Sequence, residues 1–371
     1  RSIKWCRGTG VVGLVLGVVW LARIAISETY IRTYCFQVRA MEHAHQPRGE
    51  CPIVKLARES PGGWGSLPPP AGVLGEGGDR ALAAAGGGVQ KGAQLGGRGA
   101  GVGGGEEEQR SNFGIVLMCD KGMWPEKYTK MSVANKQAYA RLHGYDVIIA
   151  TSADVDHSRP AAWSKLLVLE KHLADYDYLI FVDIDAFIMN PAFKLEWLLD
   201  VAKKQQQTNG IDAWGEGVEP DMIVTKDWNG PNSGVILIKN SDYSRWMLRE
   251  WWDQKQLVNG DFPFNYEQRA MHYLLQPDSW TEQGLPFYEA YENVRAHTVV
   301  LDQCAMNSYI VHPWQALLGT LKHGEFEGGY VKGDFMLHFA GKKGRVRTNL
   351  VDHYYPLAAK VKTDCHASTV P

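Results

Sequence analysis

The sequence has few of the residues that mark several classes of protein. It contains six cysteines among 371 residues, and no two of them form a Cys-x-x-Cys pair, which argues against a zinc ribbon or a thioredoxin-like site. Six are also too few for a disulfide scaffold, although they leave room for one or two bridges in an oxidising compartment. Asn-x-Ser/Thr sequons and internal repeats are absent, so the sequence offers no glycosylation site that would indicate its compartment.

An excess of charge of one sign is also lacking. Lys and Arg together number 39 and Asp and Glu 41, for a formal net charge of -2. This balance argues against a nucleic-acid-binding protein and against a disordered acidic tail. Because 45% of the residues are hydrophobic, the composition is that of an ordinary globular protein, and we expect no nucleic-acid partner.

Near the N-terminus, an apolar run over residues 8–27 follows three basic residues and is interrupted only by Arg23. About 20 apolar residues span a bilayer, and Arg23 can extend to the interface. The leading positive charges favour a signal anchor with a short cytoplasmic tail, residues 1–7. A cleaved signal peptide and a buried core helix are the alternatives.

A glycine-rich segment follows. Residues 60–110 hold 18 of the 40 glycines. Such a composition buries too little apolar surface to offset the entropy of ordering the chain. We therefore expect a disordered stem over residues 28–111 with a flexible linker inside it. The alternative is a low-complexity segment that has no role, because its composition would be the same.

From residue 112 onward, apolar runs typical of buried strands alternate with apolar residues at helical spacing. We expect strands at 113–118, 145–150, 178–182, 233–238 and 332–338, and helices at 130–143, 162–173, 243–252 and 266–275. This alternation predicts an α/β domain with a mainly parallel sheet. We place it at 112–356, followed by a C-terminal tail, 357–371.

Two acidic residues follow the predicted strand at 178–182, as Asp183-Ile184-Asp185. Alternate residues of a strand share one side, so both carboxylates can bind one cation. Mg²⁺ and Mn²⁺ prefer oxygen ligands and keep positions open for phosphates. The alternative is that these acids only cap a turn ahead of Asn190-Pro191.

A histidine, His338, ends a late apolar run, and Lys342, Lys343 and Arg345 follow it. One imidazole, two carboxylates and two phosphate oxygens would fill most of an octahedral Mn²⁺ site, and the basic residues would neutralise a diphosphate. A buried core histidine followed by a solvated basic turn is the alternative.

Two further stretches carry groups suited to sugars. Within 227–234 we expect a tight loop in which Asn229, Asn232 and Ser233 offer donors and acceptors to hydroxyl groups. An ordinary turn entering a strand explains the same residues. Glu267-Gln268 begins a predicted helix, where an acid either complements the helix dipole or binds a sugar.

Together these stretches resemble glycosyltransferase family 34, which includes fungal α-1,2-galactosyltransferases, mannan-polymerase subunits and plant xyloglucan α-1,6-xylosyltransferases. The resemblance covers residues 113 to about 345, and its motifs occur in the family's order. They are 139–145, 163–166, 181–186, 227–234, 245–251, 267–270, 306–309 and 338–341.

The resemblance implies a GT-A fold, a nucleotide-sugar donor, Mn²⁺ or Mg²⁺, and retention of the anomeric configuration. It favours UDP-galactose or UDP-xylose as the donor, and an oligosaccharide, glycoprotein or polysaccharide as the acceptor. It also implies a single-pass type II protein of the Golgi membrane with a luminal catalytic domain. Homo- or hetero-oligomers with other Golgi transferases are consistent with it.

Residue by residue, the resemblance implies that Asp185 and His338 bind the metal and that Asp183 contacts the metal or the donor ribose. Lys165 would lie near the nucleotide and Lys343 at the diphosphate.

The resemblance further implies two catalytic residues. Gln268 would stabilise the developing positive charge, and Glu267 would bind the donor sugar. Trp228, with the polar residues of the 227–234 loop, is expected at the sugar or acceptor. The chain departs from the family pattern at Lys342, where cysteine is common, and at Tyr266, where plant members carry an acid. A non-catalytic subunit and a nucleotide-sugar hydrolase are the alternative functions.

Overall fold

The structure is a computed structural model. It describes Cys51 and residues 88–90, 111–119, 122–123, 126–208, 219–227, 229–258, 267–276, 278–281, 284–310 and 329–367. The expected cytoplasmic tail 1–7, the apolar segment 8–27 and most of the stem lie outside these residues. Within the described parts, no helix has the length and apolar character needed to cross a bilayer.

A seven-stranded sheet forms the centre of the domain, in the order β1-β3-β2-β4-β7-β6-β8. Its strands are β1 (Gly88–Gln90), β2 (Phe113–Met118), β3 (Asp146–Ala150), β4 (Tyr178–Val182), β6 (Met222–Asp227), β7 (Gly230–Lys239) and β8 (Thr298–Leu301). Only β1 and β7 run opposite to the other five. The predicted α/β architecture with a mainly parallel sheet is confirmed.

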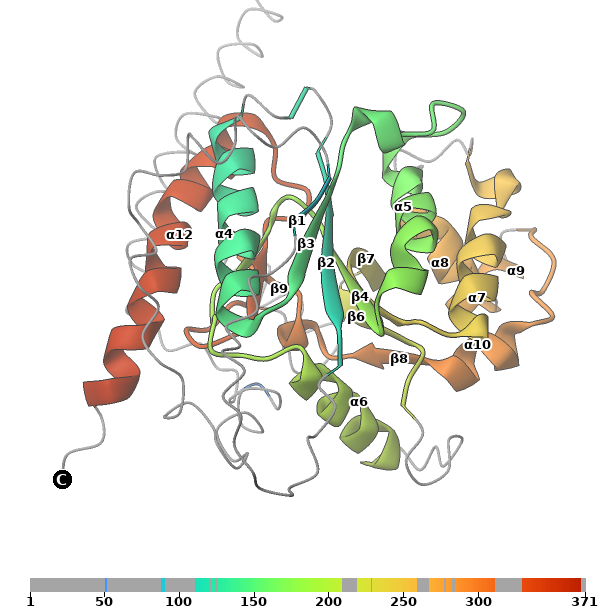
Figure 1. Cartoon of the computed structure of the whole chain (residues 1–371). Helices are drawn as coiled ribbons and strands as arrows, with labels where there is room; N and C mark the ends of the chain where they lie inside the picture. The colour runs from blue at the N-terminus through green and yellow to red at the C-terminus, as the bar shows by residue number, and fades with distance from the viewer. Residues whose placement is uncertain are drawn as a thin grey trace, which may run out of the picture. The chain divides into compact units, whose positions relative to one another are not determined.

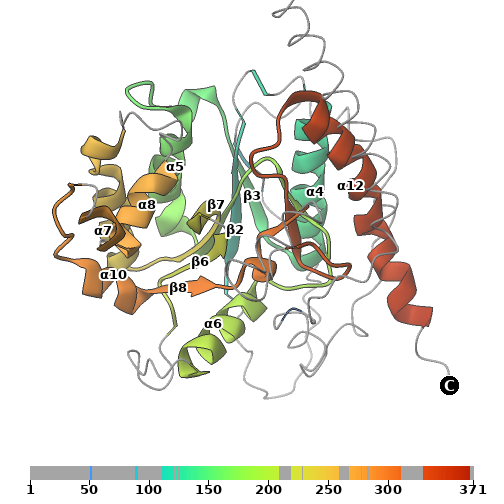
Figure 2. The same ribbon diagram turned by 180° about the vertical axis from the view of Figure 1, so that it is seen from behind.

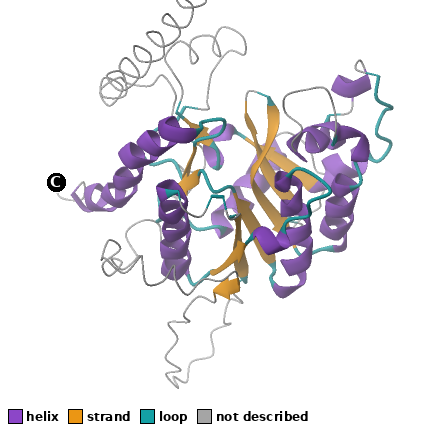
Figure 3. Cartoon of the chain, turned by 90° about the horizontal axis from the view of Figure 1, so that it is seen from above, coloured by secondary structure: helices purple, strands orange, loops and turns teal. Residues whose placement is uncertain are grey.

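Helices cover both faces of the sheet, as the view from above shows (Figure 3). On one side lie α4 (Lys127–His143) and α12 (Gly344–Ala367), and on the other lie α5 (Ser164–His172), α7 (Asp242–Trp252) and α8 (Glu267–Leu275) (Figures 1 and 2). The remaining α-helices are α6 (Glu196–Thr208), α9 (Asp278–Thr281) and α10 (Tyr291–His297).

Local sequence signals account for several helix ends. Gly144 follows α4 with φ 72°, a left-handed conformation that favours glycine, and its N–H bonds to the carbonyl of Ala140. Ser241 precedes α7, and its side chain accepts a hydrogen bond from the N–H of Ser244. The predicted helix at 162–173 is an α-helix, α5, between two short 3₁₀ segments, so helical structure covers 161–175.

The core of the sheet is apolar on both faces because helices pack against each of them. All five residues of β4 are buried, as are eight of the ten residues of β7. β7 pairs antiparallel with β4 on one side and with β6 on the other. This brings the start of β7 beside the end of β4, where the two acids follow.

The expected tight loop at 227–234 proves shorter than predicted. β6 and β7 form a hairpin in which Asp227 pairs with Gly230, and Gly230 has φ 113°. Residues from Gly230 onward belong to β7, so Asn232 and Ser233 lie in a strand. The continuous apolar run that signals a buried strand begins only at Val235, which explains why the predicted strand started at residue 233 and the observed one starts at Gly230.

A second, three-stranded sheet in the order β5-β10-β9 joins distant parts of the chain. Its strands are β5 (Ala186–Ile188), β9 (Ser308–Tyr309) and β10 (Met336–His338). His338 is in register with Ala186 on one neighbour and with Tyr309 on the other. Because β5 begins directly after Asp185, this pairing brings the histidine to the two acids.

Two expectations about the ends of the domain require correction. Gly88–Gln90, within the expected flexible linker, forms an edge strand with β3, and Cys51 forms a disulfide with Cys304. Backbone pairing at an edge requires no apolar side chains, so the glycine-rich composition did not predict it. At the other end, α12 continues past Pro356 to Ala367, through the boundary placed at residue 356.

Candidate active site

The two acids lie in a tight turn between the two sheets. The N–H of Ala186 donates to the carbonyl of Asp183 at 3.0 Å, and the N–H of Asp183 donates to the carbonyl of Gly234 at 2.7 Å. The carboxylates therefore converge because the chain turns, whereas strand alternation had been the expected cause. The turn follows β4 at its carboxyl end, where ligands bind in sheets of this kind.

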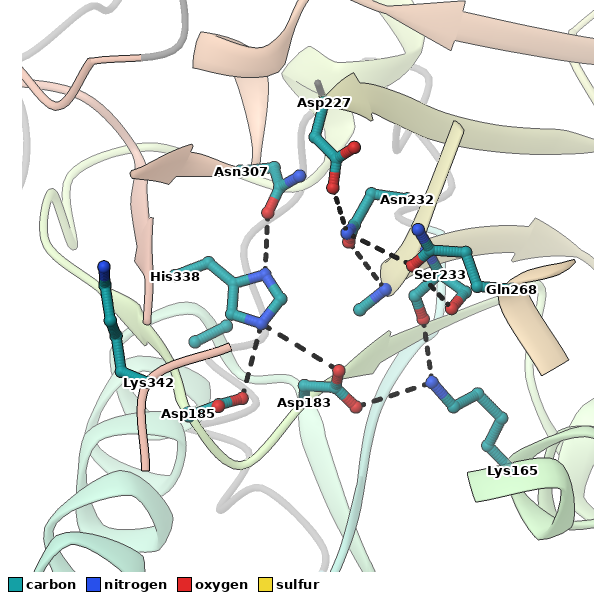
Figure 4. A network of polar contacts seen from close by, with 12 residues as sticks. Lys165, Asp183, Asp185, Asp227, Asn232, Ser233, Gln268, Asn307, His338 and Lys342 are labelled. Atoms are coloured by element: carbon teal, nitrogen blue, oxygen red, sulfur yellow. Dashed lines mark hydrogen bonds and ion pairs between the residues drawn. The ribbon is translucent and has the colours of Figure 1, made fainter. Parts of the chain in front are cut away.

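His338 completes a cluster of three side chains that could hold a metal ion. Its Nε2 atom lies 3.3 Å from Asp185 Oδ1 and 3.9 Å from Asp183 Oδ2 (Figure 4). One ligand atom from each residue lies within 4.8 Å of the others. The prediction that a histidine far along the chain meets both acids is confirmed.

These spacings and donor types fit a small divalent cation. Ligands at about 2.1 Å from an octahedral ion lie roughly 3 Å apart when adjacent and about 4.2 Å apart when opposite. The separations from the imidazole nitrogen fall in this range. Carboxylates suit Mg²⁺ and Mn²⁺, while an imidazole favours a transition metal, so the donor set favours Mn²⁺ of the two.

The two carboxyl groups differ in their electrostatic surroundings. Burial opposes ionisation of Asp185, but the hydrogen bond and charge of His338 and the charge of Arg347 outweigh it and lower its pKa to about 2. Burial raises the pKa of Asp183, and the neighbouring Asp185 adds to this rise, against the opposing effect of Lys165. The site therefore holds one strongly ionised carboxylate beside one that binds protons more readily.

Arg347, which sequence reasoning missed, belongs to this site. It lies in the first turn of α12, and its Nη2 atom is 3.3 Å from Asp185 Oδ2. Its Nε donates to the carbonyl of Lys342 at 2.6 Å and its Nη1 to the hydroxyl of Tyr128 at 3.1 Å. These contacts hold the guanidinium against one oxygen of Asp185 while the other oxygen faces the imidazole.

Lys165, predicted near the nucleotide, is 3% exposed and bound on three sides. Its Nζ lies 2.6 Å from Glu267 Oε1 and 3.5 Å from Asp183 Oδ1, and it donates to the carbonyl of Ser233 at 2.9 Å. Burial disfavours its charge, but the two acids outweigh burial and raise its pKa. Lys165 thus links Asp183 to Glu267 at the start of α8.

A second buried lysine, Lys136 on α4, lies under the acidic turn and was not predicted. Its ammonium donates to the carbonyl of Ala186 and to the hydroxyl of Ser132, and it lies 3.5 Å from the carbonyl of Asp183. Burial lowers its pKa to about 7. This group fixes the backbone of the turn rather than its carboxylates.

The start of β7 brings the predicted polar residues of the hairpin to those of α8. The Oε1 atom of Gln268 accepts from Asn232 Nδ2, from the N–H of Ser233 and from its hydroxyl, each at 3.3 Å. Glu267 Oε1 accepts from the hydroxyl of Ser233 at 2.8 Å. Its Oε2 atom is buried without a hydrogen-bond partner, which suits an acceptor for a hydroxyl group of a ligand.

The remaining predicted site residues are more exposed or lie outside the described parts. Lys343 and Asn229 are exposed, and Trp228 is not among the described residues. Lys342, next to Lys343, is half-buried, and burial lowers its pKa; it is drawn with the cluster in Figure 4. The roles assigned to these residues stay predictions.

The sequence matches a known family over much of this domain. Residues 111–346, more than half of the chain, match the model of the galactosyl transferase GMA12/MNN10 family. The chain belongs to this family. The predicted resemblance to glycosyltransferase family 34 is confirmed, and the matched range contains the metal cluster, the hairpin and α8.

Curated members of this family differ in the sugars that their names state. A probable α-1,6-mannosyltransferase of Saccharomyces cerevisiae is 27% identical over 42% of this chain and 45% of its own length. An uncharacterised α-1,2-galactosyltransferase of Schizosaccharomyces pombe is 25% identical over 67% of this chain and 74% of its own. Xyloglucan 6-xylosyltransferase 1 of Arabidopsis thaliana is 28% identical over 34% of this chain and 26% of its own. The alignments thus span less than two thirds of the first and third of these relatives.

Solved structures of glycosyltransferases are also similar. A glycosyltransferase involved in glycosylation of the PBCV-1 major capsid is 13% identical over 66% of this chain and 99% of its own, with a TM-score of 0.40. The galactosyltransferase LgtC, crystallised with donor and acceptor sugar analogues, is 14% identical over 70% of this chain and 97% of its own, with a TM-score of 0.39.

Proposed function

We propose that this chain is a retaining, Mn²⁺-dependent glycosyltransferase of the GT-A type. It transfers a hexosyl or pentosyl unit from a nucleotide sugar, with UDP-galactose or UDP-xylose favoured, to a hydroxyl group of a glycan. The observation that carries the proposal is the meeting of Asp183, Asp185 and His338 at the carboxyl end of β4, beside the polar residues of β7 and α8.

The three clustered side chains would hold the cation, leaving positions for the diphosphate. When bound, the cation supplies Lewis-acid stabilisation of the charge that forms on the leaving diphosphate. Mg²⁺ is the second candidate for this site. Lys343, in the turn after β10, is the proposed contact to the diphosphate, and half-buried Lys342 adds positive charge next to it.

Two residues of α8 are proposed to contact the donor sugar. The free Oε2 of Glu267 accepts a hydrogen bond from a sugar hydroxyl, because this buried atom has no partner in the described residues. The amide oxygen of Gln268 stabilises positive charge at the anomeric carbon. Asn232, Ser233 and Asn229, with Trp228, are the proposed contacts to the sugar or acceptor.

The reaction proceeds on one face of the sugar. The bond from the anomeric carbon to the phosphate oxygen breaks, and the diphosphate leaves with the electron pair. The acceptor oxygen bonds to the same carbon from the leaving-group side and passes its proton to a phosphate oxygen. This course needs no covalent nucleophile, and the family resemblance supports it.

The proposed location is the Golgi membrane, with residues 8–27 as a signal anchor and the domain in the lumen. Disulfides persist in oxidising compartments, so the bridge between Cys51 and Cys304 supports a luminal domain. The acceptor is proposed to be an oligosaccharide, glycoprotein or polysaccharide. Assembly with copies of itself or with other Golgi transferases belongs to the same proposal.

The test compares wild type with Asp185→Ala on a panel of UDP-galactose, UDP-xylose, UDP-glucose and GDP-mannose. Removing a metal ligand is expected to lower Mn²⁺-dependent transfer at least about a hundredfold, a loss typical of removing one transition-state contact. Asp242→Ala is the control, because Asp242 is a fully exposed acid on α7. Full activity of Asp185→Ala with metal removed would contradict the proposal.

Two other functions make different predictions in the same assay. A non-catalytic subunit would bind a nucleotide sugar without turning it over, with or without acceptor. A hydrolase would release sugar at the same rate whether or not an acceptor glycan is present. Acceptor-stimulated, Mn²⁺-dependent turnover distinguishes the transferase from both.

A further inference from the structure

The two ring nitrogens of His338 face different partners. Nε2 points toward the carboxylates of Asp183 and Asp185, whereas Nδ1 lies 2.7 Å from the side-chain oxygen of Asn307. An amide oxygen can only accept a hydrogen bond. Nδ1 of His338 therefore carries a proton and donates a hydrogen bond to Asn307, and Nε2 is the ring nitrogen that faces the acids.

Asn307 is held rigidly in the position that this contact requires. It is fully buried and precedes β9, the strand that runs parallel to the strand of His338. Its backbone N–H donates to the carbonyl of Gln303 at 2.9 Å. Hydrogen bonds of the backbone thus fix both residues of the pair. The two side chains therefore start close together, and little conformational entropy is lost when they form the contact.

The neighbours of Asn307 also determine which end of its amide faces the histidine. The hydroxyl of Tyr309 donates to Asp227 Oδ2 at 2.8 Å, so its oxygen is left as an acceptor for other groups. Asn307 Nδ2 lies 3.4 Å from that hydroxyl and donates to it. The amide nitrogen consequently faces Tyr309 and the amide oxygen faces His338 (Figure 4).

We propose that Asn307 is a positioning residue for His338: by accepting a hydrogen bond from Nδ1 it fixes the ring so that Nε2 faces Asp183 and Asp185 and can bind a cation with them. Asp227 and Tyr309 act through it by fixing the orientation of its amide. Partners of this kind orient metal-binding imidazoles and increase their basicity. The metal part of this inference rests on the proposed function, but the hydrogen bond from His338 Nδ1 to Asn307 does not.

The hydrogen bond from Nδ1 can be measured on the metal-free protein. ¹⁵N-labelling of the histidines and ¹⁵N–¹H correlation spectra show which ring nitrogens carry protons and how fast these protons exchange with water, and the spectrum of His338→Gln identifies the relevant signals. We expect Nδ1 of His338 to carry a proton that exchanges slowly with water in wild type, and faster exchange of this proton in Asn307→Leu, which lacks the acceptor. An Nδ1 without a proton in wild type, or equal exchange in the two proteins, would overturn the inference, whatever the metal affinity.

The consequence for metal binding is measured by Mn²⁺ titration followed by electron paramagnetic resonance. Asn307→Leu replaces the acceptor with an apolar side chain of similar size, and is expected to weaken Mn²⁺ binding by about 10- to 100-fold. Asn307→Asp keeps an acceptor oxygen and should restore most of the affinity. If the aspartate variant binds as weakly as the leucine variant, the acceptor is not what matters.

Asn190→Leu is the matched control. Asn190 is equally buried, and its side chain makes two hydrogen bonds, to the carbonyl of Gly333 and from the N–H of Ala192, neither of them to His338. An equal loss of Mn²⁺ affinity in Asn190→Leu and Asn307→Leu would reduce the effect to general packing and overturn the inference. Unchanged Mn²⁺ affinity in Asn307→Leu would also overturn the inference, although the proposed metal site itself would stand. If wild type binds no Mn²⁺, the proposed metal site fails, and the measurement of the Nδ1 proton still decides whether Asn307 positions His338.

Discussion

At the scale of single residues, Gly234 determines how closely β7 approaches the side chains of Asp183 and His338. A β-carbon at this position would lie 2.4 Å from His338 Cε1 and 2.9 Å from Asp183 Oδ2. We expect Gly234→Ala to push the imidazole or the acidic turn away, weakening Mn²⁺ binding at least tenfold and destabilising the fold by about 1–3 kcal/mol. Mn²⁺ titration and urea unfolding measure the two effects.

A second glycine offers a control for overpacking alone. A β-carbon at Gly114 on β2 would lie 2.7 Å from Leu179 Cδ2, away from the acids. Gly114→Ala should therefore lower stability by a similar amount while its folded fraction binds Mn²⁺ as wild type does. Unchanged metal affinity in Gly234→Ala would show that Asp183 and His338 can make room for a β-carbon at residue 234 and still bind the cation.

Residue-level prediction succeeded where the chemistry is carried by the residue type itself. Asp183, Asp185 and His338 were predicted because carboxylates and imidazole are recognisable ligands after apolar runs. Arg347 was missed, and Asn307 was noted only as part of the 306–309 motif without a role, because both roles depend on which segments become neighbours in space. The basic cluster after His338 did point toward this region, but the arginine that contacts Asp185 lies two residues beyond Arg345, on α12.

At the scale of elements, α12 connects the outer layer of the domain to the acidic turn through Arg347. The guanidinium contacts Asp185, and it also lies 5.0 Å from the ring centre of Tyr128 on α4. Arg347→Met leaves a largely buried carboxylate without this partner, so we expect a loss of about 3 kcal/mol in the free energy of unfolding. The free energy of unfolding of Arg347→Lys should lie between those of wild type and Arg347→Met, since an ammonium keeps the charge but lacks the planar fork of the guanidinium.

An exposed ion pair between α4 and α12 provides the comparison. Lys127 Nζ lies 2.7 Å from Asp352 Oδ1, with side chains that are 65% and 40% exposed. Exposed pairs contribute about 0–1 kcal/mol, so Lys127→Met should barely change the urea midpoint. Equal losses in the two variants would show that Arg347 contributes only to helix packing and not through the buried acid.

Elements with strong apolar patterns were predicted well, and those formed by pairing alone were not. β2 and β4 have the predicted bounds because continuous apolar runs mark strands buried on both faces. The antiparallel direction of β7 was not predictable, since an apolar run carries no information about strand direction. β5, β9 and the edge strand β1 have two or three residues each, too few for periodicity to show, and two of them position the site.

At the scale of the whole domain, one covalent bond joins widely separated parts of the chain. The disulfide between Cys51 and Cys304 spans 253 residues of sequence. Cys304 lies in the 3₁₀ segment Gln303–Ala305, which directly precedes the strand of Tyr309. The bond therefore ties a residue of the expected stem to a segment that supports the site, and we count this residue as part of the folded domain.

Breaking this bond should destabilise the domain by about 2–5 kcal/mol, because the bridge restricts a very long loop in the unfolded chain. Urea unfolding of Cys51→Ser, Cys304→Ser and the double variant measures the loss, and all three should agree because either substitution removes the same bond. A reducing agent should lower wild type to the level of the variants and leave the variants unchanged. Wild-type stability that does not respond to reductant under unfolding conditions, or single variants that differ by more than about 1 kcal/mol, would show that the two cysteines act separately and that residue 51 is not held to the domain through Cys304.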